Sequence, residues 1–492
     1  MKICLDPVYT GKPDRCASNI KMRKIVEYLL ERRDDVYFYW FVPDWVTEKE
    51  LGWYPKHCNI RYIKLPYSFN DRTVECLRIP KEYYSLVSFN GELWDIDVIV
   101  TNRASMVPMI KGMIHKPGPR DYWSRRVILI EDMPLMRFKD HAPMGHPESQ
   151  ELSTLIGYAC SDLTAISAFW EKDIIIKESK KYLTPSLCRR IMRSMVESSP
   201  VLVDKVETKS KRVIQDFIDK KRPFNVGFVG RMVHGNNPTD IFKVMEHMWV
   251  YYGDLDIKYH ISTQSAHVGR VKVPEFIHLR KLCREDFWEF VQTQMDVFIF
   301  MSVEEDYSMS LLEPLLLGTP AILIKRKWSV PTVGEYYPFF VRNVKEAYAL
   351  VKNFYENYPR LYKKFVEWQQ GPFQKLMKGR NDVYVPRVVE AQLDVYESDY
   401  EGNKQKFTKY RNDIVDALTK YSKESPDRSF VLREALRDIH NTEKFKATFA
   451  AKLQADADYV RRSFSVDWNN YRLRLKALGY RDVGVTPGHM GV

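Results

Sequence analysis

The feature that most constrains the fold of this chain is a regular alternation of short apolar segments with longer, helix-length segments. Residues 36–42 form a continuous apolar run whose length fits a strand buried on both faces. Apolar segments of this kind, separated by stretches long enough for a crossover helix, predict parallel strands. In the first half, the predicted strands are residues 3–5, 36–42, 60–63, 96–100, 127–130 and 164–167, and 164–167 is the last of the set. A helix capped by Asn19 is predicted to follow the first strand.

The same alternation restarts after a charged stretch that runs from Pro200 to Pro223. The pattern therefore predicts an α/β protein of two Rossmann-like domains that face a cleft, and such a cleft is the default ligand site. After about residue 345 the chain is predicted to be mostly helical. The second set of predicted strands is 224–229, 255–259, 276–279, 297–300 and 321–324. The predicted division is a first domain at 1–200, a linker at 201–223, a second domain at 224–370, and a helical basic extension at 371–492.

Charge favours an anionic partner. The formal net charge is +12, and half of it lies in residues 401–492. An excess of this size fits a nucleotide, a nucleic acid or a membrane surface, although solubility alone is an equal alternative. Seven scattered cysteines, no apolar leader and no long uncharged apolar run predict a cytoplasmic protein without a transmembrane segment.

Two segments carry the candidate chemistry. The first is the end of strand 224–229, where Gly230 and Arg231 follow. Glycine at a strand end lets the backbone approach a phosphate closely, and the arginine would offer a fork of donors to a diphosphate. The alternative is an ordinary strand-to-loop turn with a solvated arginine.

The second segment follows strand 297–300 and leads from a polar loop into an apolar helix that is predicted to start near Ser308 or Ser310. Glu313 lies in this helix among leucines, and such a carboxylate needs a partner. A ribose diol would suit it; a pairing with Lys325, or a place on the helix surface, is the alternative. The loop residues are Glu305, Asp306, Tyr307 and Ser308, and Gly318-Thr319-Pro320 ends the helix.

This second segment resembles the signature of the family 4 retaining glycosyltransferases, which have the GT-B fold. Glu305, the second glutamate eight positions later and the Gly-Thr-Pro turn match position for position, and Gly230-Arg231 matches the family's phosphate-binding strand end. Three departures stand out: Asp306 and Ser308 replace glycines, and Asn236 replaces a phosphate-binding lysine, for which Lys243 is a possible substitute.

The resemblance implies a function for each matching residue. Glu313 would hold the ribose of a nucleotide-sugar donor, most simply a UDP-sugar, and Arg231 would neutralise the leaving diphosphate. Glu305 and the backbone of the residues up to Ser308 would orient the donor sugar. The first domain would bind the acceptor hydroxyl, transfer would retain the anomeric configuration, and no metal would be obligatory.

Weaker candidates lie elsewhere. Asp140, His141, His146 and Glu148 form a polar cluster in the first domain, where His141 is a possible acceptor contact or base, although loop solvation is the simpler interpretation. The acid pairs Asp95/Asp97 and Asp254/Asp256 have a metal-binding spacing, but acids that mark strand edges are the preferred explanation.

The acceptor stays open on sequence. One hypothesis is a hydroxymethylated pyrimidine in DNA, the acceptor of some bacteriophage enzymes of this fold, because the C-terminal region combines basic residues with aromatics. A second is a glycan or lipid-linked polysaccharide acceptor. A third is a nucleic-acid-binding protein whose transferase fold has lost activity.

Overall fold

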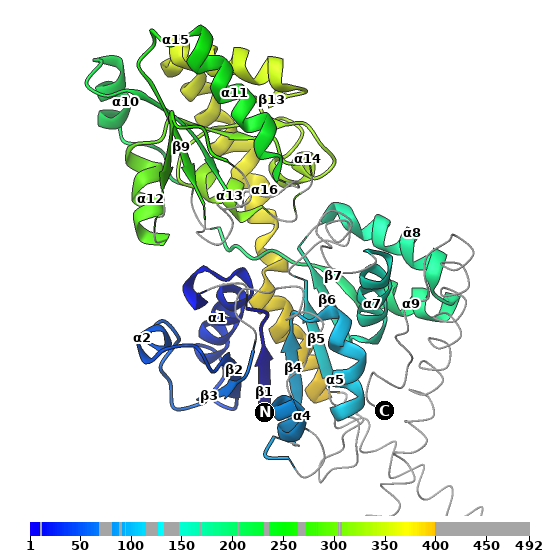
Figure 1. Ribbon diagram of the computed structural model, residues 1–492. Helices are drawn as coiled ribbons and strands as arrows, with labels where there is room; N and C mark the ends of the chain where they lie inside the picture. Colours follow the sequence, from blue (N-terminus) through cyan, green and yellow to red (C-terminus); the bar gives the residue numbers. More distant parts are fainter. Residues whose placement is uncertain are drawn as a thin grey trace, which may run out of the picture.

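The computed structural model contains two α/β domains, each built on one parallel sheet (Figure 1). The first sheet has seven strands in the order β3-β2-β1-β4-β5-β6-β7, and every neighbouring pair is parallel. The structure describes residues 1–9, 12–67, 81–87, 91–93, 95–114, 126–131, 147–167, 169–203, 206–230, 236–263, 272–280, 282, 284–303, 305 and 308–398. The first-sheet strands are β1 (Lys2–Asp6), β2 (Tyr37–Pro43), β3 (Ile60–Leu65), β4 (Val98–Thr101), β5 (Arg126–Ile130), β6 (Leu163–Ile166) and β7 (Met195–Glu197).

The second sheet has six parallel strands in the order β10-β9-β8-β11-β12-β13. In both sheets the chain starts in the middle, builds one side and then crosses to the other, as in a doubly wound fold. The strands are β8 (Phe224–Val229), β9 (Ile257–Ser262), β10 (Ile277–Arg280), β11 (Val297–Phe300), β12 (Ala321–Ile324) and β13 (Phe340–Val341).

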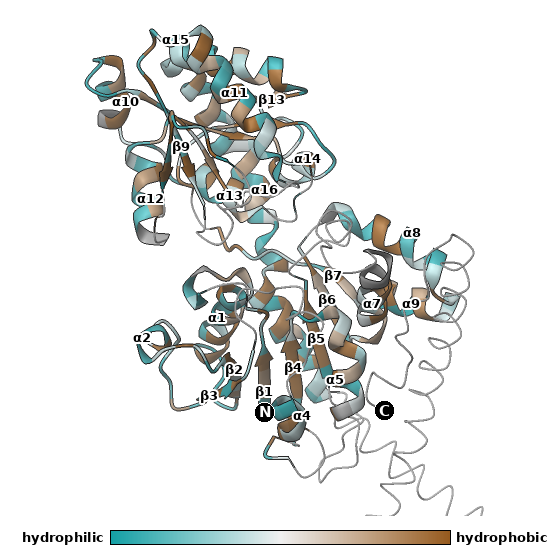
Figure 2. Ribbon diagram, in the orientation of Figure 1, coloured by the Kyte–Doolittle hydropathy of each residue, from teal (hydrophilic) through white to brown (hydrophobic). Residues whose placement is uncertain are grey.

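Hydrophobic residues concentrate on the central strands of both sheets (Figure 2). All four residues of β4, β6, β11 and β12 are buried, because helices cover both faces of a parallel sheet. In the first domain the helices are α1 (Ala17–Leu30), α2 (Glu48–Leu51), α4 (Lys81–Val87), α5 (Val107–Ile114), α7 (Pro147–Cys160), α8 (Lys172–Tyr182) and α9 (Pro185–Ser194).

The helices of the second domain divide between the two faces of its sheet. Right-handed crossovers from the two central strands run in opposite directions and therefore use opposite faces. Accordingly, α11 packs on α15, and α12 packs on α13. The bounds are α10 (Lys211–Ile218), α11 (Pro238–Tyr251), α12 (Arg284–Thr293), α13 (Met309–Leu316), α14 (Ser329–Val333), α15 (Val344–Trp368) and α16 (Gln374–Gly379).

The chain crosses between the domains twice. It leaves the first domain after β7, and it returns near residue 384 to form a helix at residues 385–398. The two crossings are hydrogen-bonded to each other: the backbone N–H of Val385 donates to the Ser199 carbonyl at 2.8 Å, and Asn381 binds both backbone groups of Val203. Val385, Val389, Leu393 and Tyr396 then pack in the core of the first domain.

Several local predictions differ from the structure. Asn19 lies inside α1, where it is buried and donates to the Tyr54 hydroxyl; Cys16 precedes the helix instead. β7 extends the first sheet beyond the strand predicted as the last. Helix α10 occupies part of the segment 201–223 that was assigned to a linker, so the crossing is shorter than predicted.

Candidate functional site at the facing sheet edges

The carboxyl ends of the two parallel sheets face each other. Trp170 lies in the short helix η4 (Phe169–Glu171), which follows β6 of the first domain. Its indole Nε1 donates to the backbone carbonyl of Glu305, which follows β11 of the second domain, at 3.1 Å. Trp170 also packs against the core of the second domain. In open α/β sheets, ligands bind in the crevice at this carboxyl edge, where the strand order reverses.

The end of β8 requires a glycine. Gly230 has a φ of +149°, a conformation that side chains rarely adopt. A Cβ atom there would lie 2.9 Å from Cζ of Phe228 and 3.0 Å from Nδ2 of Asn236. The backbone therefore turns sharply beside the start of α11. Arg231 lies outside the described residues, so its place relative to this turn stays a prediction.

The loop after β11 leads directly into α13. The Glu305 side chain is only 4% exposed, and Ser308 is equally enclosed. Ser308 adopts the left-handed region with φ +41°, and α13 begins at the next residue. This start, at Met309, lies between the two predicted positions, Ser308 and Ser310. Asp306 and Tyr307 lie outside the described residues.

Glu313 is partly buried on α13, whose neighbouring leucines are fully buried. The alternative pairing with Lys325 does not occur, because the Lys325 ammonium lies over the Phe340 ring instead. Pro314 follows Glu313 inside the helix rather than in its first turn. Because proline has no backbone N–H, the carbonyl of Ser310, four residues earlier, receives no helical hydrogen bond from it.

Buried polar atoms without a hydrogen-bond partner gather on both facing edges. In the second domain they follow three adjacent central strands, and in the first domain they follow β4, β6 and β7. Buried polar groups are normally paired, so such a cluster needs a ligand or water to complete it. The sequence gives little indication of these atoms, because each belongs to a single small polar residue without a recognisable motif. The atoms are Asn236 Oδ1, Thr263 Oγ1, Ser302 Oγ, Asn102 Oδ1, Ser167 Oγ and Ser198 Oγ, and none is more than 8% exposed.

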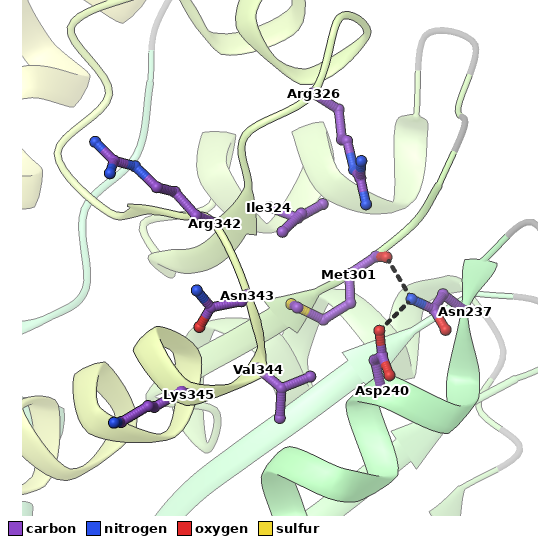
Figure 3. Close-up of a pocket in the computed structure, with 9 residues that line it drawn as sticks. All are labelled: Asn237, Asp240, Met301, Ile324, Arg326, Arg342, Asn343, Val344 and Lys345. Atoms are coloured by element: carbon purple, nitrogen blue, oxygen red, sulfur yellow. Dashed lines mark hydrogen bonds between the residues drawn. The ribbon is translucent and has the colours of Figure 1, made fainter.

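A cavity of about 490 Å³ opens at the same edge of the second sheet, above β11, β12 and β13 (Figure 3). It lies between the first turns of α11 and α15. Sequence reasoning did not find it, because its residues come from four separated segments. The lining residues are Asn237, Asp240, Met301, Ile324, Arg326, Arg342, Asn343, Val344 and Lys345.

At the corresponding edge of the first domain, an ion pair is fully buried. Arg103 donates from Nε to Asp6 Oδ1 at 2.9 Å and from Nη2 to the Pro7 carbonyl at 3.1 Å, and both charged side chains are 0% exposed. The Tyr67 hydroxyl and the Thr101 hydroxyl donate to the remaining carboxylate positions. This pair rigidly joins the ends of β1 and β4.

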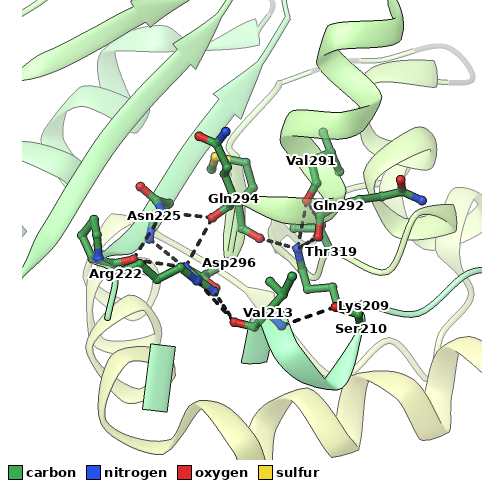
Figure 4. A network of polar contacts seen from close by, with 12 residues as sticks. Lys209, Ser210, Val213, Arg222, Asn225, Val291, Gln292, Gln294, Asp296 and Thr319 are labelled. Atoms are coloured by element: carbon green, nitrogen blue, oxygen red, sulfur yellow. Dashed lines mark hydrogen bonds and ion pairs between the residues drawn. The ribbon is translucent and has the colours of Figure 1, made fainter. Parts of the chain in front are cut away.

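The opposite, amino edge of the second domain is different, because its buried polar groups satisfy one another (Figure 4). Arg222 makes a two-pronged ion pair with Asp296, at 2.6 and 2.7 Å. Lys209 donates to the carbonyls of Val291, Gln292 and Met295 at the end of α12. These charges belong to the stretch that the sequence assigned to a linker, and in the structure they anchor it to the second domain.

Beside this network, His260 on β9 is held neutral. Burial, and secondarily the nearby Arg280, lowers its pKa to about 3. Arg280 Nε donates to His260 Nδ1 at 3.2 Å. The proton of the neutral ring therefore sits on Nε2, which donates to Asn225 Oδ1 at 2.8 Å.

This histidine gives a prediction for pH dependence. Between its unfolded pKa near 6.5 and the folded value, only the unfolded state binds the proton, so stability is complete above pH 6.5 and falls as the pH drops. The free energy of unfolding should decrease by about 1.4 kcal/mol per pH unit in that window. Urea titrations at pH 6.5 and 5 should show this loss, and His260→Asn should lack it. The exposed His57 provides the matched control, since His57→Asn should keep the parental pH slope.

The remaining sequence candidates are structural or lie outside the described residues. Asp140, His141 and His146 lie outside the described residues, and Glu148 lies in the first turn of α7. Asp97 accepts from the Lys2 backbone N–H and the Tyr396 hydroxyl, and Asp95 pairs with the Lys2 ammonium, so this acid pair fastens the amino edge of the first sheet. Within the described ranges, no group of three or more potential ligands has metal-binding geometry. None of the described helices is long and apolar enough to cross a bilayer.

Comparison with solved structures identifies the fold. The chain resembles Anabaena HepE (Alr3699), crystallised with UDP and glucose, at a TM-score of 0.51 and 12% identity, over 80% of this chain and 98% of HepE. The two-domain architecture is that of the GT-B proteins. The α,α-trehalose-phosphate synthase of Burkholderia vietnamiensis superimposes less closely, at a TM-score of 0.47 and 10% identity, over 82% and 99% of the two chains. No protein-family model and no curated protein matches the sequence.

Proposed function

We propose that this chain is a glycosyltransferase that moves a sugar from a nucleotide-sugar donor to a hydroxyl acceptor between the two facing sheet edges. The observation that carries the proposal is the set of six buried, unpartnered polar atoms on these edges. All six belong to amide or hydroxyl side chains that can accept from hydroxyls of a sugar or ribose, and the hydroxyls among them can also donate. HepE, which shares this fold and is 12% identical to this chain, was crystallised with UDP and glucose.

The proposed donor site lies at the point where the strand order of the second sheet reverses. The sharp turn at Gly230 allows a diphosphate to approach the backbone at the end of β8, where Arg231 would balance its charge. The partly buried Glu313 would accept hydrogen bonds from the two ribose hydroxyls. Lys243, suggested as a substitute for the lysine missing at Asn236, is already paired with Asp240 at 2.9 Å.

The proposed chemistry stabilises the leaving group. Departure of the nucleoside diphosphate leaves negative charge at the end of β8, where fixed donors lower the barrier without rearranging. Glu305, enclosed at 4% exposure, would orient the donor sugar. A hydroxyl of the acceptor, entering from the first domain, would attack the anomeric carbon on the face that the leaving group vacates and would give its proton to the departing diphosphate oxygen, and the configuration of the sugar would be retained.

For the acceptor, we favour a hydroxymethylated pyrimidine in DNA over a glycan or a lipid-linked polysaccharide. The support is the charge distribution, since half of the net charge of +12 lies in residues 401–492, outside the described residues. Basic residues there would neutralise DNA phosphates. Transfer of labelled sugar to hydroxymethylated DNA but not to unmodified DNA would establish this acceptor; transfer only to glycans would exclude it.

The proposed function has a direct test in nucleotide binding and donor hydrolysis. UDP at 100 times its dissociation constant should stabilise the protein by about 2.7 kcal/mol, because it binds only the folded state. A thermal-shift series with UDP, GDP and adenosine diphosphate should show a rise for one base, and the purified protein should slowly hydrolyse the matching nucleotide sugar. Binding of DNA without any nucleotide response or hydrolysis would favour the inactive, nucleic-acid-binding alternative.

A further inference from the structure

A basic surface covers the outer side of two consecutive helices in the first domain. Residues 172–194 comprise α8, α9 and the two residues between them, and they contain seven lysines or arginines but only two acids. Of these acids, Glu178 is buried and paired with Lys181, so it offsets one of the seven cations. Six of the basic side chains are exposed, and together they are called the α8–α9 surface: Lys177, Lys180, Lys181, Arg189, Arg190 and Arg193.

The spacing of the cations places them on the solvent side of each helix. Lys177 and Lys180 are three positions apart in α8, and Arg189 and Arg193 are four apart in α9. Each pair therefore lies on one side of its helix, opposite the buried residues. The two helices contact each other, and α7 packs against both (Figure 1). None of these four cations forms an ion pair with a carboxylate in the part of the chain that the structure describes, so all four are available to an external anion.

The composition of this surface favours a polyanion in solution over a membrane. A helix that binds a bilayer surface needs a broad exposed apolar side. In α8 and α9, both described in full, Met192 is the only large apolar side chain that is exposed, whereas Leu187 and Ile191 pack in the core of the first domain. A row of phosphates requires only lysine and arginine side chains on a fixed frame. The charge pattern therefore matches a DNA backbone.

Helix α8 begins beside the contact between the two domains. Its first residue, Lys172, directly follows η4, in which Trp170 donates to the Glu305 carbonyl. The 11 residues of α8 give it a length of about 16 Å, or about five phosphate spacings along one DNA strand. A strand that runs along α8 and past its first turn would therefore arrive at the facing sheet edges.

We propose that the α8–α9 surface binds the phosphates of acceptor DNA and guides one strand toward the facing sheet edges. Three observations support this role: the excess of positive charge, the scarcity of exposed apolar side chains on the two helices, and the start of α8 beside the interdomain contact. The inference rests on the proposed function, because that function takes hydroxymethylated DNA as the acceptor. DNA binding itself can nevertheless be measured without any donor.

The test is the salt dependence of DNA binding by the full-length protein, measured with a short duplex. The variant Lys177→Gln/Lys180→Gln/Arg189→Gln/Arg193→Gln should make the slope of log affinity against log salt shallower by about 2–4, since each lost phosphate contact removes about 0.9. At 0.1 M salt, this change corresponds to an affinity loss of roughly 100- to 1,000-fold. The difference from the parental slope isolates α8 and α9 from basic residues elsewhere in the chain.

The matched control removes four exposed cations from the second domain. Arg360→Gln/Lys363→Gln/Lys364→Gln/Lys375→Gln changes α15 and α16 and should keep the parental slope. The eight side chains replaced in the two variants are all exposed, so both variants should unfold close to the parental temperature. With hydroxymethylated DNA as the acceptor, the α8–α9 variant should raise KM for DNA and leave kcat at saturating DNA near the parental value.

The outcomes separate this inference from the proposed function. A parental salt slope in the α8–α9 variant, an equal change in the control, or an unchanged KM for DNA would each overturn the inference. So would loss of binding to vesicles of phosphatidylcholine and phosphatidylserine while DNA affinity stays parental, because the surface would then serve a membrane. UDP affinity should be the same in both variants and the parent. Salt-sensitive DNA binding through α8 and α9 in a protein that neither binds UDP nor hydrolyses a nucleotide sugar would support the surface and refute the transferase function.

Discussion

Arg103→Met is expected to destabilise the first domain by about 3–5 kcal/mol, because it leaves the buried Asp6 carboxylate without its counter-charge. Asp6 and Arg103 are both 0% exposed, so water cannot replace the lost partner. The hydroxyls of Tyr67 and Thr101 still donate to Asp6, but two neutral hydrogen bonds do not balance a full charge. Calorimetry that resolves the unfolding of the two domains should show the loss in one transition only.

The matched control for this variant is Arg61→Met on β3 of the same sheet. Arg61 pairs with Glu92, but these side chains are 58% and 49% exposed, so the effect should stay below about 1 kcal/mol. Adding Asp6→Asn to Arg103→Met should recover part of the stability, because the orphaned charge is then removed. Equal effects of the two arginine variants would show that the buried pair contributes no more than a surface pair.

Glu313→Ala is expected to weaken UDP binding by about 100-fold, and with it the turnover of the donor. The estimate takes the loss of two hydrogen bonds to a charged group, about 3 kcal/mol in total. Glu313 is partly buried on α13 and its neighbours are packed leucines, so the truncation should leave the helix intact. Titration with UDP measures the affinity directly and does not require an acceptor.

Two comparisons make the Glu313 result interpretable. Glu313→Gln keeps the length and one acceptor oxygen, so it should lose less affinity than the alanine variant. Glu289→Ala removes an exposed glutamate from α12 and should bind UDP like the parent. Parental affinity in Glu313→Ala would refute the ribose assignment while leaving open where else in the protein the nucleotide binds.

The fold class was predictable from the sequence because its main strands are long apolar runs. Residues 224–229 and 321–324 coincide with β8 and β12. The edge strands β7 and β13 have three and two residues, too few for any periodic pattern, and both were missed. Asn19 was misplaced as a cap because a local rule for helix starts cannot see its distant partner, Tyr54.

The candidate site was predictable only where its residues are close in sequence. Glu305 and Glu313 lie within one strand–loop–helix unit, so their spacing was visible, although their roles stay predictions. Arg103 is 97 positions from Asp6, and Trp170 is 135 positions from Glu305, so neither contact leaves a local signal. The charges between residues 201 and 223 were assigned to a linker because charged residues are rarely buried, whereas Lys209 is buried and Arg222 is half-buried, each with partners.

The double crossing of the chain between the domains restricts how the two facing sheet edges can move apart. Two adjacent backbone segments connect the domains. They are hydrogen-bonded to each other through Ser199 and Val385 and again through Val203 and Asn381, so together they form one hinge. Such a hinge allows the domains to rotate about the axis that runs through the two connecting segments, and it resists twisting or sliding of one domain against the other. The two domains should therefore open by rotation about this single axis. The hydrogen bond from Trp170 to the Glu305 carbonyl joins the two domains, so it must break when they open.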